Sequence, residues 1–88
     1  MYKIPEEEVE RMQERLHRLT GRQSEILDHV LDGSTNEEIA TILGISRRTV
    51  ETHRLRVMAA LGAHNTAELV GKVVWLRARE HFLDHVAV

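Results

Sequence analysis

A glycine between two short apolar repeats is the feature that most constrains what this chain can fold into. The segment 36–61, NEEIATILGISRRTVETHRLRVMAAL, places apolar residues at helical spacing on both sides of Gly44. Glycine readily adopts the positive φ that ends a helix, and Ser46 can cap the next helix by accepting from its unpaired backbone N–H groups. The pattern predicts two short helices joined by a tight turn, the second over residues 47–61, as in a helix-turn-helix.

The outward face of the second helix is basic, although the chain is acidic overall. Its 88 residues include 12 Lys and Arg against 14 Asp and Glu, a net charge of -2. Residues 46–61 nevertheless carry four arginines and one glutamate. Because salt screens charges over about 8 Å, a local basic patch can attract phosphate on an acidic chain. The front of the second helix is also the part of a helix-turn-helix that enters the DNA major groove.

Six segments of the chain follow one another in a recognisable order and spacing. They are LTGRQSEIL (residues 19–27), TNEEIA, LGIS, RTVETHR, VMAALGA and AELV. In this arrangement the chain resembles the LuxR-type helix-turn-helix family, and most closely its FixJ-like response-regulator output domains. The resemblance covers most of positions 19–76. It implies a DNA-binding domain of four helices, in which the fourth often pairs two protomers on DNA.

Local signals predict three further helices. Pro5 and the glutamates after it favour a helix that ends near Arg18, because proline and acidic residues suit a helix N-terminus. Three helix starts show a capping residue three positions before Gln or Glu: Thr20 with Gln23, Thr35 with Glu38, and Asn65 with Glu68. We therefore expect an all-α fold without strands: a small LuxR-type four-helix core with an extra N-terminal helix.

The length of the chain permits one small domain with additions at both ends. We expect residues 1–18 to form an acidic amphipathic helix, residues 19–76 the DNA-binding domain, and residues 77–88 an extension of the last helix with a C-terminal tail. The receiver domain typical of FixJ-like regulators would be missing if the chain is complete. Its longest apolar run, LVGKVVWL, falls far short of the roughly 20 residues that span a bilayer. A cytoplasmic protein without a membrane partner is expected.

Two arginines in the first turn of the second motif helix are candidates for DNA contact. Positive charge at a helix N-terminus opposes the helix dipole, so Arg47 and Arg48 favour contact with phosphates or guanine over a merely solvated helix end. Thr49 on the same turn and Arg56 two turns later are further candidates. Arg54 and Arg56 are weaker individually, because either one can pair with a carboxylate or remain solvated.

The resemblance places base-reading residues on one outward stripe, Glu51, Thr52 and Leu55. A glutamate can accept a hydrogen bond from the cytosine amino group, and Leu55 or the Thr52 methyl can touch a thymine methyl. The alternative is a helix face that approaches DNA without reading it. Thr35 and Asn36 cap the first motif helix, where the family tends to anchor the DNA backbone. Capping alone also explains them.

The last helix has more apolar residues than one core face needs. Leu69, Val73 and Leu76 can all face the core, which leaves Val70, Val74 and Trp75 as candidates for a dimer interface. A helix that is apolar on more than one side needs a second partner. This partner is either another protomer or the leading helix of the same chain, and we expect a homodimer on double-stranded DNA.

The residues favour a DNA-binding transcription regulator over an enzyme. The chain has no cysteine, no glycine-rich phosphate loop, no apparent nucleophile with a base, and no cofactor signature. His81 and His85 lie four positions apart but lack a third ligand, so no metal site is expected. The alternative function is a stand-alone protein-interaction module that pairs with and modulates a full-length regulator. Another regulator or RNA polymerase is a further partner to consider.

Overall fold

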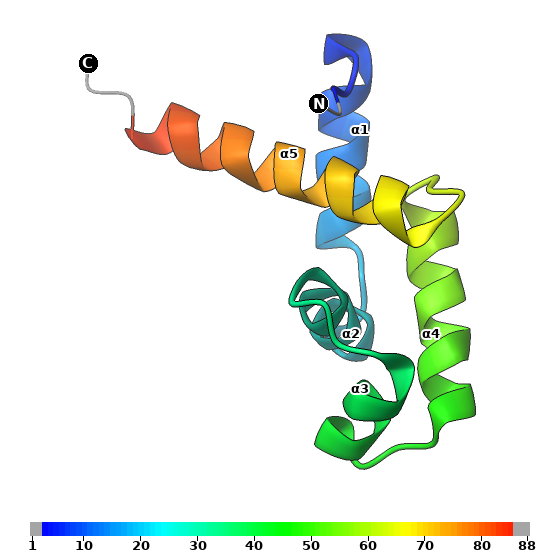
Figure 1. Ribbon diagram of the computed structural model, residues 1–88. Helices are drawn as coiled ribbons and strands as arrows, with labels where there is room; N and C mark the ends of the chain where they lie inside the picture. The colour runs from blue at the N-terminus through cyan, green and yellow to red at the C-terminus, as the bar shows by residue number, and fades with distance from the viewer. Residues whose placement is uncertain (1–2, 86–88) are drawn as a thin grey trace.

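Five helices make up the structure, a computed structural model that describes residues 3–85 without the side chain of His85 (Figure 1). They are α1 (Glu6–His17), α2 (Gly21–Leu31), α3 (Asn36–Leu43), α4 (Arg47–Ala60) and α5 (Thr66–His85). No strand occurs within this range. The expected all-α fold, with one helix ahead of the other four, is confirmed.

Three of the helices begin where the sequence predicts capping residues. Thr20 Oγ1 accepts from the backbone N–H of Gln23 at 3.1 Å, and the Gln23 side chain accepts from the Thr20 N–H at 3.1 Å. The same reciprocal pair joins Thr35 and Glu38, at 3.1 and 2.9 Å. The Asn65 side chain likewise caps the start of α5. These bonds satisfy backbone donors that the helices cannot pair internally.

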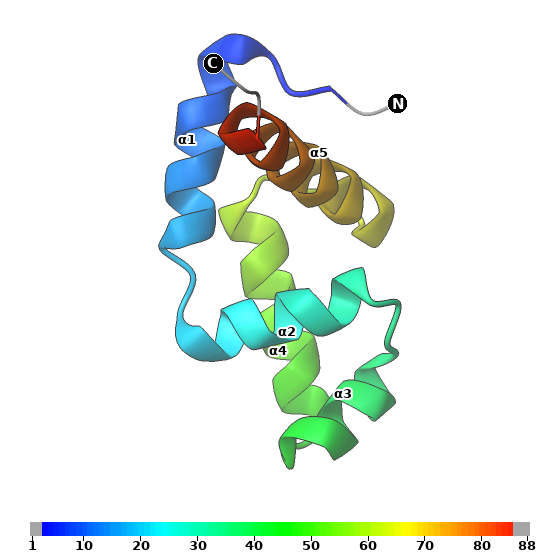
Figure 2. The same ribbon diagram turned by 90° about the vertical axis from the view of Figure 1, so that its left-hand side faces the viewer.

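The core lies where α2 and α3 pack against α4 and where α5 closes the other end of α4 (Figures 1 and 2). Its fully buried side chains come from four helices and from the turn after α4: Ile26, Leu27, Ile39, Val50, Val57, Leu61, Leu69, Val73 and Leu76. Burial of an aliphatic side chain of this size contributes roughly 1.5 to 3 kcal/mol. The core therefore fixes α4 in a single orientation relative to α3.

The N-terminal segment packs against α5, at the end of the molecule away from α3 (Figures 1 and 2). Ile4, Val9 and Met12 are buried in the same core cluster. The Glu6 carboxylate pairs with Arg79 near the end of α5, and the Arg79 guanidinium also lies 5.7 Å from the Trp75 ring centroid. The acidic leading helix is thus part of the folded body.

Candidate nucleic-acid interface

The turn between α3 and α4 sets the angle between the two motif helices. Gly44 has φ 67° and ψ 35°, a left-handed conformation that suits glycine. The N–H of Ile45 donates to the carbonyl of Ala40 at 3.1 Å, which closes the end of α3. Ser46 Oγ then accepts from the N–H of Thr49 at 3.0 Å and starts α4. The predicted turn chemistry is confirmed.

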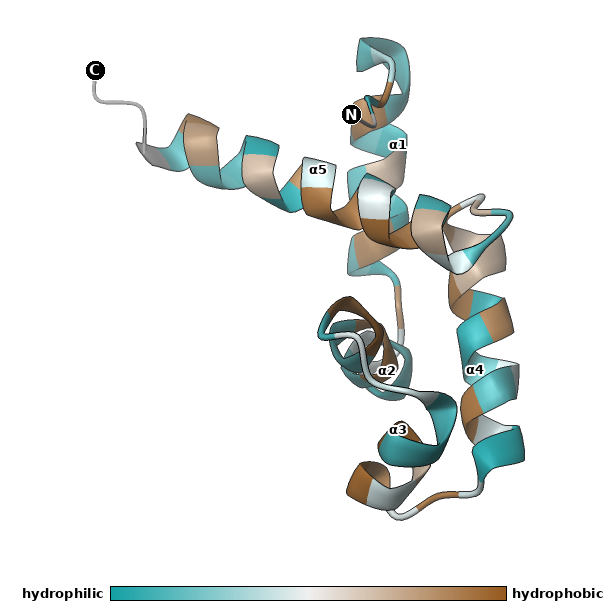
Figure 3. Cartoon of the chain, in the orientation of Figure 1, coloured by the Kyte–Doolittle hydropathy of each residue, from teal (hydrophilic) through white to brown (hydrophobic). Residues whose placement is uncertain are grey.

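The first turns of α4 present a polar face to solvent, whereas Val50 and Val57 are buried on the opposite side. Figure 3 shows hydrophilic residues at the start of this helix. Leu55 is the apolar exception, with 65% of its surface exposed. Glu51 is half-buried, and the other candidates on this helix are exposed: Arg47, Arg48, Thr49, Thr52, Leu55 and Arg56. Their contact with DNA remains a prediction.

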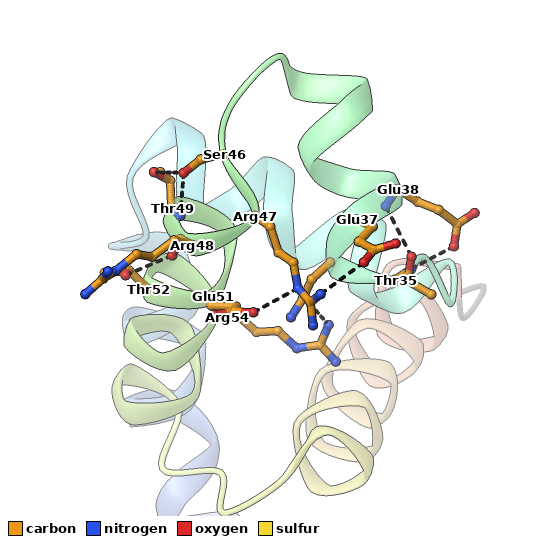
Figure 4. A network of polar contacts seen from close by, with 11 residues as sticks. Thr35, Glu37, Glu38, Ser46, Arg47, Arg48, Thr49, Glu51, Thr52 and Arg54 are labelled. Atoms are coloured by element: carbon orange, nitrogen blue, oxygen red, sulfur yellow. Dashed lines mark hydrogen bonds and ion pairs between the residues drawn. The ribbon is translucent and has the colours of Figure 1, made fainter.

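Arg47 lies between two carboxylates (Figure 4). Its Nε donates to Glu51 Oε1 at 3.0 Å within α4, and its Nη1 donates to Glu37 Oε1 at 3.0 Å on α3. The sequence placed Arg47 on the interface but did not reveal these partners. The two ion pairs are exposed to solvent, so phosphate can compete for the guanidinium.

Arg48 and Arg56 border a shallow open depression along α4. The other residues that line it carry hydroxyl or imidazole groups: Ser46, Thr49, Thr52 and His53. No carboxylate lines this depression, and no ion pair of Arg48 or Arg56 occurs among residues 3–85. The Thr52 hydroxyl donates to the carbonyl of Arg48 at 3.0 Å, so its lone pairs and methyl group remain for a partner. This side of α4 carries uncompensated positive charge.

His53 is half-buried at the edge of the same depression. Its Nδ1 atom is buried and has no hydrogen-bond partner among the described residues. The structure therefore places His53 at the edge of the core.

Arg54 joins three helices, which sequence reasoning missed. Its Nη1 donates to Asn36 Oδ1 at 2.9 Å, and its Nη2 donates to Thr66 Oγ1 at 2.8 Å. The expectation of a carboxylate pair or a solvated side chain was wrong, because the packing of α3 and α5 against α4 brings two neutral acceptors to the guanidinium. Asn36, a candidate DNA contact, thus has its side-chain oxygen engaged within the protein.

Thr35 and Glu38 form the N-terminal cap of α3. The Thr35 backbone N–H donates to the Glu38 carboxylate and lowers the pKa of that carboxyl below its ordinary value. Glu38 therefore remains ionised and keeps its cap at neutral pH. Local hydrogen bonds therefore fix the N-terminus of α3, whether or not this end contacts DNA.

The three candidate dimer residues on α5 differ in exposure. Val70 and Trp75 are half-buried and pack against the core, whereas Val74 is 52% exposed. Phe82 and Leu83, near the end of the same helix, are more exposed than any of these three. Val74 is therefore the member of the predicted set that is most accessible to another molecule.

A family model described as "Bacterial regulatory proteins, luxR family" matches residues 17–73, which is well over half of the chain. The chain belongs to the LuxR family. The match covers α2, α3 and α4 with the first part of α5, and it includes every candidate DNA contact. The expected LuxR-type membership is confirmed, and it places the chain among bacterial regulatory proteins.

Curated relatives of this LuxR-family chain carry regulatory names. It is 54% identical over 54 residues to the uncharacterized response regulatory protein YgeK of Escherichia coli K12, covering 61% of this chain and 37% of that protein. It is 46% identical over 66 residues to the transcriptional regulatory protein TdiR of Thauera aromatica, covering 75% and 28%. It is 45% identical over 56 residues to the transcriptional regulatory protein FixJ of Rhizobium meliloti, covering 64% and 28%.

The matched part of the LuxR-family chain spans only 28% to 37% of these three relatives. No solved structure matches it significantly. Among the described residues, no helix is long and apolar enough to cross a bilayer, and no group of three or more potential metal ligands gathers. Of the two histidines that the sequence offered as an incomplete metal site, His81 and His85, the side chain of His85 lies outside the described part.

Proposed function

We propose that this chain binds double-stranded DNA sequence-specifically and regulates transcription, with α4 lying in the major groove. The observation that carries this proposal is the exposed front of α4. It presents Arg48 and Arg56 without carboxylate partners, beside hydroxyl groups and the exposed Leu55. A helix of this kind, supported from behind by α2 and α3, has the form of a recognition helix.

The residues on this surface have separate roles in the proposal. Arg48, Arg56 and Thr49 contact phosphates and fix the position of α4, because such contacts give affinity without reading sequence. Thr52 and Leu55 meet base edges at the floor of the groove. Glu51, Arg47, Thr35 and Asn36 complete the proposed DNA-binding set, with Glu51 accepting from a cytosine amino group.

The distribution of charge supports this orientation. The acidic α1 lies at the end of α4 away from α3 (Figure 1), so its glutamates are far from the proposed DNA surface. Because screening in salt acts over about 8 Å, these glutamates repel a DNA molecule at α4 only weakly. They also reduce non-specific attraction elsewhere on the protein.

We propose that two protomers pair through α5 and present two recognition helices to paired half-sites. Val74 supports this, because it is exposed on the part of α5 whose Leu69, Val73 and Leu76 fill the core, and Val70 and Trp75 flank it. A single domain with few phosphate contacts binds weakly, and dimerisation adds a second set of contacts.

We also propose that the chain has three parts. Residues 19–76 form the DNA-binding domain, preceded by the acidic helix in 1–18 and followed by the extension in 77–88. The protein acts in the cytoplasm, where DNA and RNA polymerase are accessible.

A second function is a protein-interaction module that pairs with a full-length regulator. The exposed Phe82 and Leu83, at 67% and 57%, favour it, because they lie on turns of α5 that the family match does not cover. This function predicts heterodimers with weak intrinsic DNA binding. Direct contact between α4 and a duplex separates the two functions.

Amide chemical-shift mapping by NMR with a mixed-sequence duplex tests the proposed surface. We expect the largest changes at the start of α3 and in the first three turns of α4, with small changes in α1. Changes confined to the end of α5, or no change at low salt, would overturn the proposal and favour the interaction module.

A further inference from the structure

The Glu37 carboxylate is an unexpected group on a surface proposed to meet DNA. It stands in the first turn of α3, with 74% of its side chain exposed, and accepts from Arg47 Nη1 at 3.0 Å. The two residues come from different helices of the motif (Figure 4). Phosphates repel a carboxylate that lies beside them, so the Glu37–Arg47 pair affects how tightly the protein binds DNA.

Arg47 differs in this respect from the other exposed arginines of α4. Arg48 and Arg56 have no ion pair within residues 3–85, so they can contact phosphate without giving up a partner. Arg47 must exchange Glu37 or Glu51 for phosphate, and the released carboxylate then remains near a polyanion. The cost of replacing Glu37 by phosphate falls on every DNA sequence alike, because the phosphate backbone is the same in each.

The second partner of Arg47 makes the exchange depend on sequence. Glu51 accepts from Arg47 Nε at 3.0 Å. When a duplex offers a cytosine amino group to Glu51, that new hydrogen bond compensates for the loss of Arg47. When it offers none, Glu51 and Glu37 together keep the arginine, and the phosphate contact is not made. The three residues Glu37, Arg47 and Glu51 thus connect a phosphate contact with a base contact.

We infer that Glu37 is a specificity-determining residue, which holds Arg47 in an ion pair that phosphate must replace and so weakens binding to DNA that lacks the operator. This inference rests on the proposed function. It assigns Glu37 a role beyond folding, since exposed ion pairs contribute little to stability. The residue discriminates against wrong sequences without touching a base.

A double-mutant cycle on a fluorescent duplex without an operator tests the inference. Binding is measured by anisotropy at several salt concentrations for the unchanged chain, Glu37→Gln, Arg47→Ala and the double variant. We expect Glu37→Gln to raise the association constant about threefold and to steepen the logarithmic salt dependence by about 0.9. When Arg47→Ala is already present, Glu37→Gln should raise the logarithm of the association constant by less than half as much.

Glu14→Gln is the matched control, because it removes one exposed carboxylate of α1, which pairs with Arg18 just after that helix. It should leave binding to this duplex nearly unchanged. An equal rise with Glu14→Gln, or a rise with Glu37→Gln that persists without Arg47, would overturn the role of Glu37. Failure of the unchanged chain to bind duplex at low salt would overturn the proposed function itself, and this inference with it.

Discussion

The guanidinium of Arg54 donates to the side-chain oxygen of Asn36 at 2.9 Å, from the middle of α4 to the first residue of α3. The same guanidinium reaches Thr66, the first residue of α5. One partly buried side chain therefore ties α4 both to α3 and to α5, the proposed dimer helix. A contact of this kind fixes the positions of the helices relative to one another and does not stabilise one helix by itself.

We predict that Arg54→Ala lowers the free energy of unfolding by about 1 to 2 kcal/mol, because two hydrogen bonds from a charged donor are lost. Urea denaturation measures this change. Arg56→Ala on the same helix is the control, since Arg56 is exposed and should change stability by less than about 0.5 kcal/mol. Equal effects of the two substitutions would show that the Arg54 contacts do not hold the helices together.

We predict that Gly44→Ala costs about 1 to 2 kcal/mol of stability, because alanine adopts a left-handed conformation only with strain. A Cβ at Gly44 meets no atom within 4 Å, so the cost comes from the backbone alone. Gly21→Ala is the matched control. It also meets no atom within 4 Å but lies in a helix, where alanine is neutral or stabilising. In thermal unfolding, Gly44→Ala should lower the midpoint temperature, whereas Gly21→Ala should leave it unchanged or raise it.

Acid should weaken the α3 cap through Glu38. Its pKa is held below the ordinary value by the hydrogen bond from the Thr35 backbone, so the unfolded chain binds this proton more readily than the folded chain. The stabilisation is complete above the unfolded pKa and is lost as pH falls through the folded pKa. Between about pH 5 and pH 3, Glu38→Gln should therefore lose less stability than the unchanged chain.

The urea midpoint at several pH values in this range measures the effect of Glu38. Glu10→Gln, on the exposed side of α1, serves as the control for removal of a carboxylate without a cap. The same pH dependence in Glu38→Gln as in the unchanged chain would argue that the cap contributes nothing in acid.

Substitutions on α4 should separate affinity from specificity. Arg56→Ala should weaken binding to all sequences and reduce the logarithmic salt slope by about 0.9, as expected for a phosphate contact. Thr52→Ala should cost about 1 to 3 kcal/mol on the operator and relax the preference at one base pair. Anisotropy on operator and unrelated duplexes distinguishes these patterns, and a uniform loss from both variants would refute the assigned roles.

The oligomeric state tests the proposed α5 interface. Val74→Glu should shift a dimer toward monomer in sedimentation experiments, because a charge is buried between two protomers. Ile42→Glu on α3 changes a residue of similar exposure, 59% against 52%, and should leave the dimer intact. A dimer that survives Val74→Glu would place the interface elsewhere, for example at Phe82.

The helix starts and the central turn could be predicted because their signals are local. A capping box requires two residues three positions apart, as in Thr20 with Gln23, and the turn requires only the backbone freedom of Gly44. Family resemblance then indicated which face of α4 should meet DNA. These features depend only on residues that are close in sequence, so they can be predicted from one sequence.

The partners of Arg47 and Arg54 could not be predicted in the same way. Glu37 is ten positions from Arg47, and Asn36 is eighteen positions from Arg54. Both contacts depend on the angle between α3 and α4, which no local pattern encodes. The pairing of Glu6 with Arg79 likewise depends on how α1 packs against α5.

The most direct test of the central claim is selection from a randomised duplex pool with the purified chain, at two salt concentrations, followed by sequencing. If the face of α4 reads DNA in a dimer, the retained duplexes should be enriched in a motif of two related half-sites. This enrichment should persist at the higher salt concentration. Retention without enrichment, lost as salt rises, would contradict sequence recognition and leave only electrostatic attraction to phosphate.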